Sequence, residues 1–147
     1  MIPKLDEETK ETLRRIIKNC VYGDLATIDV DGRTPRVRPV CAFLQDDFSI
    51  LIPSHRKTRK IAELEACSRA EICFVDKEHW QVRAAGDVEV VEDVAEKKRL
   101  IETTLSPQLW RGFFSEGEHD ERFVLYRLVP ESFEWMKEWE LEYRRPK

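Results

Sequence analysis

The sequence predicts a mainly β (α+β) fold, in which an antiparallel barrel or curled sheet of about six strands carries helices on its outside. Three observations support this prediction. About six runs rich in β-branched and aromatic residues are separated mostly by short connections. The first three runs follow one another by turns alone, whereas parallel strands need a helix-length crossover. Three segments with helical periodicity or capping residues supply the flanking helices.

The N-terminal third is predicted to form one helix and one β-hairpin. Asp6 can cap the helix, and the apolar residues between Leu13 and Cys20 recur at the spacing of a single helical stripe. The hairpin turns at Asp31-Gly32, which is the strongest short hairpin signal in the chain. Pro35 and Pro39 indicate that the second strand of this hairpin lies at an edge or carries a bulge.

The middle of the chain continues with strands. The apolar run at residues 48–53 follows a polar turn and predicts a strand buried on both faces. A short helix is expected next, with Thr58 as its N-cap and its end near Cys67. Strands four and five are predicted at residues 70–76 and 80–93, with Gly86 marking a bulge or bend in the second of them.

The last third is predicted to hold a helix, a strand and a tail. Residues 93–105 carry apolar side chains on one side and stop before Pro107. Residues 123–130 form the final strand, and residues 131–147 form an aromatic tail. Large aromatic side chains in this region would leave an unusually apolar surface on a monomer, so the pattern predicts a homodimer; they are Trp110, Phe113, Trp135 and Trp139.

Composition limits the functional classes. The net charge is −4, with 29 acidic against 25 basic residues, which argues against a general nucleic-acid binder. No apolar run approaches the roughly 20 residues of a membrane span, and the N-terminus lacks a signal core, so a cytoplasmic protein without membrane contact is expected. The cysteines form no CxxC pair and predict reduced, mostly buried thiols and no metal site; they are Cys20, Cys41, Cys67 and Cys73.

Cations concentrate in two short stretches of this acidic chain. In "RTPRVRPV", Arg36 and Arg38 point to the same face of a strand, so two guanidinium groups flank one spot. In "SHRKTRKIAEL", Arg59 and Lys60 occupy the first turn of a helix, where cations are unfavourable unless they bind an anion. These residues predict a phosphate site. For Arg56 and Lys57, a solvated face is the alternative interpretation.

The order of "RVRPV", "PSHRKTRKIAEL", "RAEICFVD" and "WQVRAAGDVEVVED" resembles the FMN-binding split β-barrel family of the pyridoxamine 5'-phosphate oxidases, from about the first strand to Pro130. The resemblance implies that residues 1–147 form a single Greek-key split barrel of six antiparallel strands. It also implies a homodimer that binds FMN in a groove between subunits. The residues that it matches to cofactor contacts are Arg36, Val37, Arg38, Pro39, Val40, Pro53, Ser54, Thr58, Arg59, Lys60 and Gln81.

Within this set the resemblance implies different roles. Thr58, Arg59 and Lys60 match a Ser-Arg-Lys triplet that holds the phosphate, and Gln81 matches a glutamine that contacts the flavin ring. Pro53 stands where the family often has an aromatic residue, and it has no backbone N–H to donate to a ligand.

The function expected from the resemblance is that of an FMN-dependent oxidoreductase, an NAD(P)H-dependent reductase of a small molecule. The Trp-Gln-Gly-Gly and Arg-Leu-His segments of the true oxidases have no counterpart, so pyridoxamine 5'-phosphate oxidation itself is not expected. Hydride transfer to a flavin needs no side-chain acid or base, and no catalytic residue is assigned. The alternatives are a non-catalytic flavin-binding module for storage, sensing or stress protection, and a split barrel that uses deazaflavin or haem.

Overall fold

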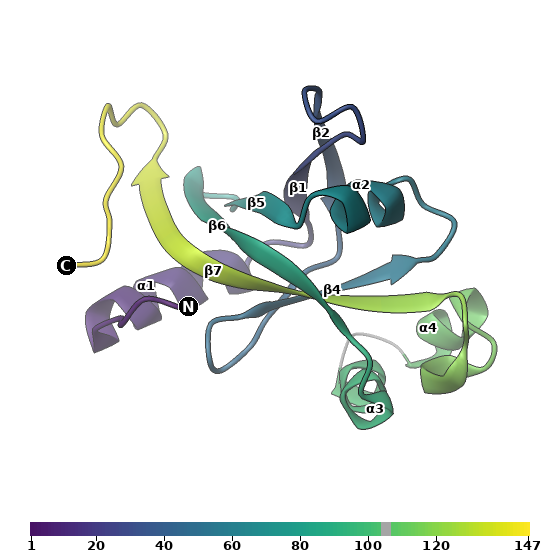
Figure 1. Cartoon of the computed structure of the whole chain (residues 1–147). Helices are drawn as coiled ribbons and strands as arrows, with labels where there is room; N and C mark the ends of the chain where they lie inside the picture. Colours follow the sequence, from purple (N-terminus) through teal and green to yellow (C-terminus); the bar gives the residue numbers. More distant parts are fainter. Residues whose placement is uncertain (104–106) are drawn as a thin grey trace.

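A curled antiparallel sheet of seven strands forms the centre of the computed structural model, which describes residues 1–103 and 107–147 (Figure 1). The strand order is β2-β1-β5-β6-β7-β4-β3. The strands are β1 (Gly23–Ile28), β2 (Pro35–Val40), β3 (Phe43–Leu44), β4 (Ile50–His55), β5 (Arg69–Val75), β6 (Trp80–Val91) and β7 (Phe123–Lys137). The helices are α1 (Glu7–Lys18), α2 (Lys60–Ala66), α3 (Val94–Thr103), α4 (Pro107–Phe113) and the short 3₁₀ helix η1 (Gly117–His119).

The predicted fold class is confirmed, because the sheet is antiparallel throughout and curls as a split barrel with helices outside it. The sequence predicted six strands, and the described residues form seven. The additional strand, β3, has only two residues and pairs with β4 after a tight turn in which Gln45 N donates to Ser49 O over 2.8 Å. A two-residue strand carries no alternating pattern from which a sequence could reveal it.

The prediction of a tail after residue 130 is wrong, because β7 continues to Lys137 and pairs with β6 from Leu125 to Lys137. Pro130 is tolerated inside the strand since it faces Gly86 at a bulge, where the register shifts between Ala85 and Gly86. A Cβ at Gly86 would lie 2.0 Å from Val129 O, so the two strands approach too closely for any other residue. The predicted bulge at Gly86 is therefore confirmed.

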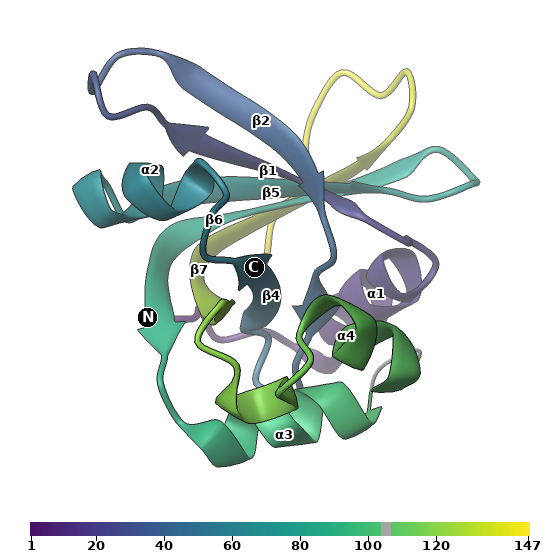
Figure 2. The same cartoon turned by 90° about the vertical axis from the view of Figure 1, so that its right-hand side faces the viewer.

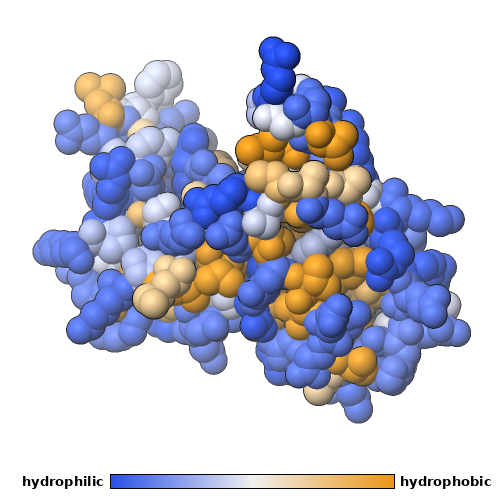
Figure 3. Space-filling view, viewed as in Figure 1, coloured by the Kyte–Doolittle hydropathy of each residue, from blue (hydrophilic) through white to orange (hydrophobic). Residues whose placement is uncertain are grey.

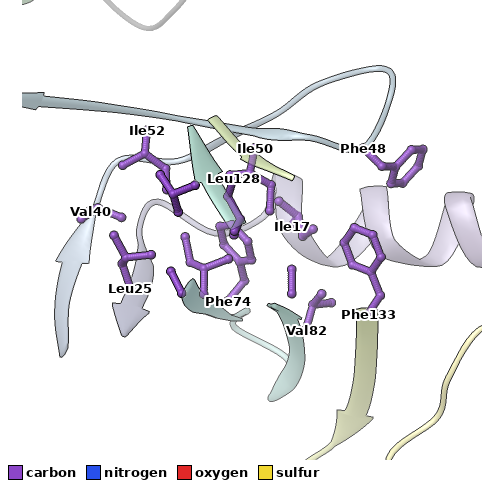
Figure 4. Packing of buried hydrophobic residues seen from close by; sticks show 14 of the residues in the cluster. Ile17, Leu25, Val40, Phe48, Ile50, Ile52, Phe74, Val82, Leu128 and Phe133 are labelled. Carbon is purple, nitrogen blue, oxygen red and sulfur yellow. The ribbon is translucent and has the colours of Figure 1, made fainter. Parts of the chain in front are cut away.

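The main core lies between the curled sheet and α1. Figure 4 shows buried side chains from strands far apart in the sheet order, including Val40 of the edge strand β2 and Ile52 of β4, in the same cluster. Helix α1 adds Ile17 from the predicted apolar stripe, and Asp6 caps it as expected, since its side chain accepts from Thr9 N. A smaller apolar cluster lies on the opposite face of β4 and β7, under α3 and α4 (Figure 1).

The late aromatic residues divide between these clusters and solvent. Trp135 is buried in the main core, and Trp110 is half-buried against the smaller cluster. Phe113 and Trp139 remain 65% and 88% exposed. Only part of the predicted apolar surface is therefore present on the single chain.

The structure confirms some of the local predictions and contradicts others. The hairpin at Asp31-Gly32 is confirmed, with β2 at the edge of the sheet and Gly32 at φ +71°. The expected end of the helix at residues 104–105 lies outside the described residues. The cysteines are unpaired, but the expectation that they are mostly buried is wrong, since Cys41 is exposed and the others are half-buried. No helix among the described residues is long and apolar enough to cross a membrane.

Candidate functional site

The segment between β4 and α2 is held in a tight, hydrogen-bonded turn. His55 O accepts from Thr58 N over 3.0 Å and from Thr58 Oγ1 over 2.7 Å. Lys60 Nζ donates in turn to Thr58 Oγ1 over 3.2 Å. The prediction that Thr58 caps α2 is therefore wrong, because its hydroxyl is bound to His55 O and Arg59 takes the N-cap position without a side-chain bond. Thr58 instead ties the lysine to the end of β4.

Ser54 is the least satisfied polar group of this segment. It is 4% exposed, and its Oγ makes no hydrogen bond to any described residue. Alternation along β4 places Ser54 on the same face as Ile52, which belongs to the main core, and Pro53 on the opposite face. An unsatisfied buried hydroxyl costs about 1–3 kcal/mol, so this atom is suited to a hydrogen bond with a ligand.

Glu63 lies at the centre of a buried ionic network on α2. Its side chain is fully buried and binds three partners. Oε1 accepts from Thr27 Oγ1 over 2.8 Å and from Arg38 Nη2, and Oε2 accepts from Arg59 Nε over 3.1 Å. Figure 2 shows α2 beside the β1–β2 hairpin, which brings these elements together.

Arg36 and Arg38 share a face of β2 as expected, but they do not flank one free spot. Arg36 pairs with Asp29, with Nη2 and Oδ2 2.6 Å apart. Arg38 Nη1 donates to Leu25 O and to Thr27 Oγ1, over 3.2 and 2.8 Å, besides its bond to Glu63. Each guanidinium thus has its own protein partners.

The network has more positive than negative charge. Arg38, Arg59 and Lys60 supply three positive charges against the single negative charge of Glu63. Lys60 is only 9% exposed and forms no ion pair with a described residue. Burial lowers the pKa of Lys60, Arg38 lowers it further, and Glu63 opposes both. Two of these cations, Arg38 and Lys60, are largely buried, and such a surplus of positive charge favours binding of an anion.

Arg56 and Lys57, in the same stretch, differ from each other. Arg56 is not simply solvated, because its Nε donates to Glu121 O over 2.7 Å and its backbone N to Arg122 O over 2.8 Å. Arg56 thereby ties the turn to the segment before β7. The Lys57 side chain is exposed and makes no hydrogen bond with the described residues, which agrees with the solvated interpretation.

The remaining predicted residues lie apart from this network. Val37 and Pro39 are exposed on the opposite face of β2 from Arg38, while Val40 is buried in the main core. Gln81 is on β6, and alternation places it on the opposite face from the buried Val82. Its Oε1 accepts from Arg83 Nε over 3.2 Å and from Tyr143 Oη over 3.3 Å. Within one chain, Gln81 and the turn between β4 and α2 therefore lie on different faces of the sheet.

Sequence reasoning missed Glu63 and Thr27. The signal for Glu63 was available, since a carboxylate beside Leu64 on the inward side of a short amphipathic helix must find a cationic partner. No pattern marked Thr27, whose importance depends on a contact with a residue 36 positions later. Among the described residues, no group of His, Cys, Asp and Glu is arranged to hold a metal ion.

Comparisons with known proteins agree with this architecture. The sequence model of the family described as pyridoxamine 5'-phosphate oxidase matches residues 9–137. No curated protein matches the chain. General Stress Protein 26 from Bacillus anthracis is similar in structure, with a TM-score of 0.73 at 20% identity over 92% of this chain and 97% of that one.

Two further solved structures show that the fold occurs with different ligands. A pyridoxamine 5'-phosphate oxidase-related, FMN-binding protein from Nostoc punctiforme has a TM-score of 0.73 at 18% identity, over 97% of this chain and 91% of that one. A haem-binding protein from Mycobacterium smegmatis has a TM-score of 0.71 at 17% identity, over 90% and 55%. Such low identities establish the fold alone. Because the family model covers most of the sequence, the chain belongs to the pyridoxamine 5'-phosphate oxidase family.

Proposed function

We propose that this protein is an FMN-binding oxidoreductase, an NAD(P)H-dependent reductase of a small molecule. The observation that carries the proposal is the unsatisfied, buried Ser54 hydroxyl near the end of β4, followed directly by a turn and helix whose partly buried ionic network has surplus positive charge. A phosphate monoester carries about −1.5 to −2 charges at pH 7 and three acceptor oxygens. It therefore matches both the charge and the unused donors of this segment.

The residues that would hold the phosphate differ in how many donors they have available. Lys60 Nζ uses one bond on Thr58 and has two further N–H groups. Arg59 uses only its Nε among the described residues, so both terminal nitrogens can donate. Ser54 Oγ can donate its proton. Bound FMN would supply the hydride chemistry, while these side chains bind and orient it.

The homodimer is part of the proposal, because it explains how Gln81 reaches the cofactor. Arg83 is a donor only, so the atom of Gln81 that faces it must be the carbonyl oxygen, and the amide N–H₂ is left to donate to a ligand. In one chain this amide lies on the other face of the sheet from Lys60. In a homodimer, the outer sheet face of the second subunit would lie against the turn between β4 and α2. The Gln81 amide of that subunit would then reach the cofactor bound at this turn.

The surface is compatible with such an interface. Val37 and Val75 are 68% and 55% exposed on the outer side of the sheet. Figure 3 shows several hydrophobic patches that interrupt an otherwise hydrophilic face. Sedimentation should give a dimer at micromolar concentration, and a monomer would contradict this part of the proposal. The unpaired cysteines support a reducing, cytoplasmic location.

The cofactor is tested first by releasing it from the purified protein by denaturation and identifying it by mass. FMN is expected, while deazaflavin, haem or no cofactor would overturn the assignment. The redox role is tested by adding NADH or NADPH to the FMN-loaded protein under anaerobic conditions. Bleaching of the flavin absorbance is expected for a reductase, and its absence would favour a non-catalytic flavin-binding module.

The phosphate site is tested by titrating the apoprotein with FMN and with riboflavin, which lacks the phosphate. Arg59→Ala should weaken FMN binding about 10- to 150-fold, since a hydrogen bond to a charged group contributes roughly 1.5–3 kcal/mol. Riboflavin binding should stay unchanged. Lys57→Ala is the matched control, because it removes a positive charge from the same turn and the Lys57 side chain makes no hydrogen bond with a described residue. Equal losses for both ligands would show that this turn is not the phosphate site.

A further inference from the structure

We propose that Glu63 is a positioning residue, which holds Arg59 in place for the phosphate while Arg38 and Thr27 fix Glu63 from the other side. The inference rests on the proposed FMN site and assigns to Arg38 a different role from the cofactor contact that its sequence position implies.

The carboxylate of Glu63 is fixed at both oxygens. Oε1 is bound by Thr27 and Arg38, which come from the two strands of the β1–β2 hairpin. Oε2 is left for a single partner, Arg59, at 3.1 Å. Because the Glu63 side chain is fully buried, water does not compete for these hydrogen bonds. Its orientation is therefore set by the hairpin.

Arg59 is the member of the network that faces outward. Its side chain is 62% exposed, and it lies four residues before Glu63, at the N-cap of α2. The bond through Nε leaves the two terminal nitrogens as a parallel pair of donors, which is the geometry that guanidinium groups use for phosphate. Without Glu63, an exposed arginine would sample many rotamers, and ordering it would oppose binding.

Arg38 has the opposite pattern of bonds. Nη1 donates to Leu25 O and to Thr27 Oγ1, and Nη2 donates to Glu63. Its terminal nitrogens are thus largely used by the protein, and its side chain is only 20% exposed. We therefore assign Arg38 to the support of Glu63, and the direct phosphate bonds to Arg59.

The double variant Arg38→Gln/Glu63→Gln separates positioning from charge. It removes one positive and one negative charge, so the surplus of two positive charges in the network is unchanged. It also avoids leaving one buried charge without its partner, and the two amides can still hydrogen-bond. Circular dichroism and a thermal melt check that the variant folds. FMN and riboflavin are then titrated against the apoprotein in the wild-type and double-variant backgrounds, each with and without Arg59→Ala.

If Glu63 positions Arg59, the double variant should weaken FMN binding by about the same factor as Arg59→Ala, roughly 10- to 150-fold, and should bind riboflavin equally well. Arg59→Ala should then cost less than about threefold in the double variant, against at least about tenfold in the wild type, since the two changes remove the same interaction. The single variant Glu63→Gln adds one net positive charge and should nevertheless weaken FMN binding. A pure field effect would strengthen it.

The outcomes distinguish this inference from the proposed function. An unchanged FMN affinity in the double variant, or an equal cost of Arg59→Ala in both backgrounds, would overturn the positioning role and leave the phosphate site intact. If the wild type binds riboflavin as tightly as FMN, the phosphate site itself is wrong.

Discussion

Two buried carboxylates of this protein are bound by arginine in different ways. Asp120, which follows η1, is held by a single arginine. Its Oδ1 accepts from Arg122 Nε and its Oδ2 from Arg122 Nη2, over 2.9 and 2.7 Å, and Glu116 N and Arg122 N add backbone bonds. The hydrogen bonds from Arg122 hold the pKa of Asp120 far below its usual range. The single negative charge of Asp120 is balanced by the single positive charge of Arg122, and both residues lie in the loop between η1 and β7.

Glu63 shares its charge between two arginines, and the nearby Lys60 has its pKa lowered by burial and by Arg38. The two regions are neighbours, since Arg56 bonds the turn before α2 to Arg122 O and Glu121 O. The comparison shows that a buried ion pair with balanced charge serves to fix a loop. The network around Glu63 has, in contrast, surplus positive charge and follows the unsatisfied Ser54 hydroxyl in the chain, which is why we propose that it binds an anion.

The largest expected effects separate the two regions, because a variant in one should change FMN affinity and a variant in the other should change the melting temperature. Lys60→Ala should weaken FMN binding about 10- to 150-fold, since it removes charge-assisted bonds to the phosphate, and it should leave the melting temperature little changed. Arg122→Ala should lower the melting temperature, because Asp120 then loses its ionic partner, and it should leave FMN affinity unchanged. Flavin titration and thermal melts measure both quantities. If Arg122→Ala weakened FMN binding as much as Lys60→Ala did, the division between the two regions would fail.

A smaller effect is expected from pH. Burial lowers the pKa of Lys60 in the free protein, and a bound phosphate should raise it again. Between these two pKa values FMN binding takes up a proton, so its affinity should fall as pH rises, by at most about tenfold per pH unit. The unfolded chain also binds this proton more tightly than the folded apoprotein does. The stability of the apoprotein should therefore rise with pH between the lowered pKa and the ordinary lysine value of 10.5.

Titrations of FMN from neutral to alkaline pH measure this slope. Riboflavin over the same range corrects for ionisation of the flavin ring itself. The variant Lys60→Gln should remove the difference between the two ligands. A difference that persists in Lys60→Gln would mean that another group titrates on phosphate binding.

The smallest effect is expected at Arg56, which joins the two regions. Arg56→Ala removes the bond from Nε to Glu121 O and keeps the backbone bond to Arg122 O. It should lower stability by about 1 kcal/mol and change FMN affinity by less than about fivefold. Denaturant unfolding and flavin titration check the two values. A larger loss of FMN affinity than for Lys60→Ala would place the phosphate nearer to Arg56 than we propose.

Features that depend on neighbours in the chain could be predicted from the sequence. The cap of α1 at Asp6, the hairpin turn at Gly32 and the bulge at Gly86 each follow from the conformation or bonding that one residue type permits. Arg59 and Lys60 were also identified as phosphate-site candidates, because cations at the start of a helix conflict with its local electrostatics.

Features that depend on distant partners were decided by the tertiary structure alone. The continuation of β7 past Pro130 requires a bulge at Glu131 opposite Gly86 of β6, which lies more than 40 residues earlier in the sequence. The pairing of Arg38 with Glu63, and with it the orientation of Arg59, requires α2 to pack beside the β1–β2 hairpin. Ser54 is left unsatisfied among the described residues because none of them brings a partner to its hydroxyl. Local patterns determine where a charge or a turn occurs, but burial and the choice of ion-pair partner are set by residues far apart in the chain.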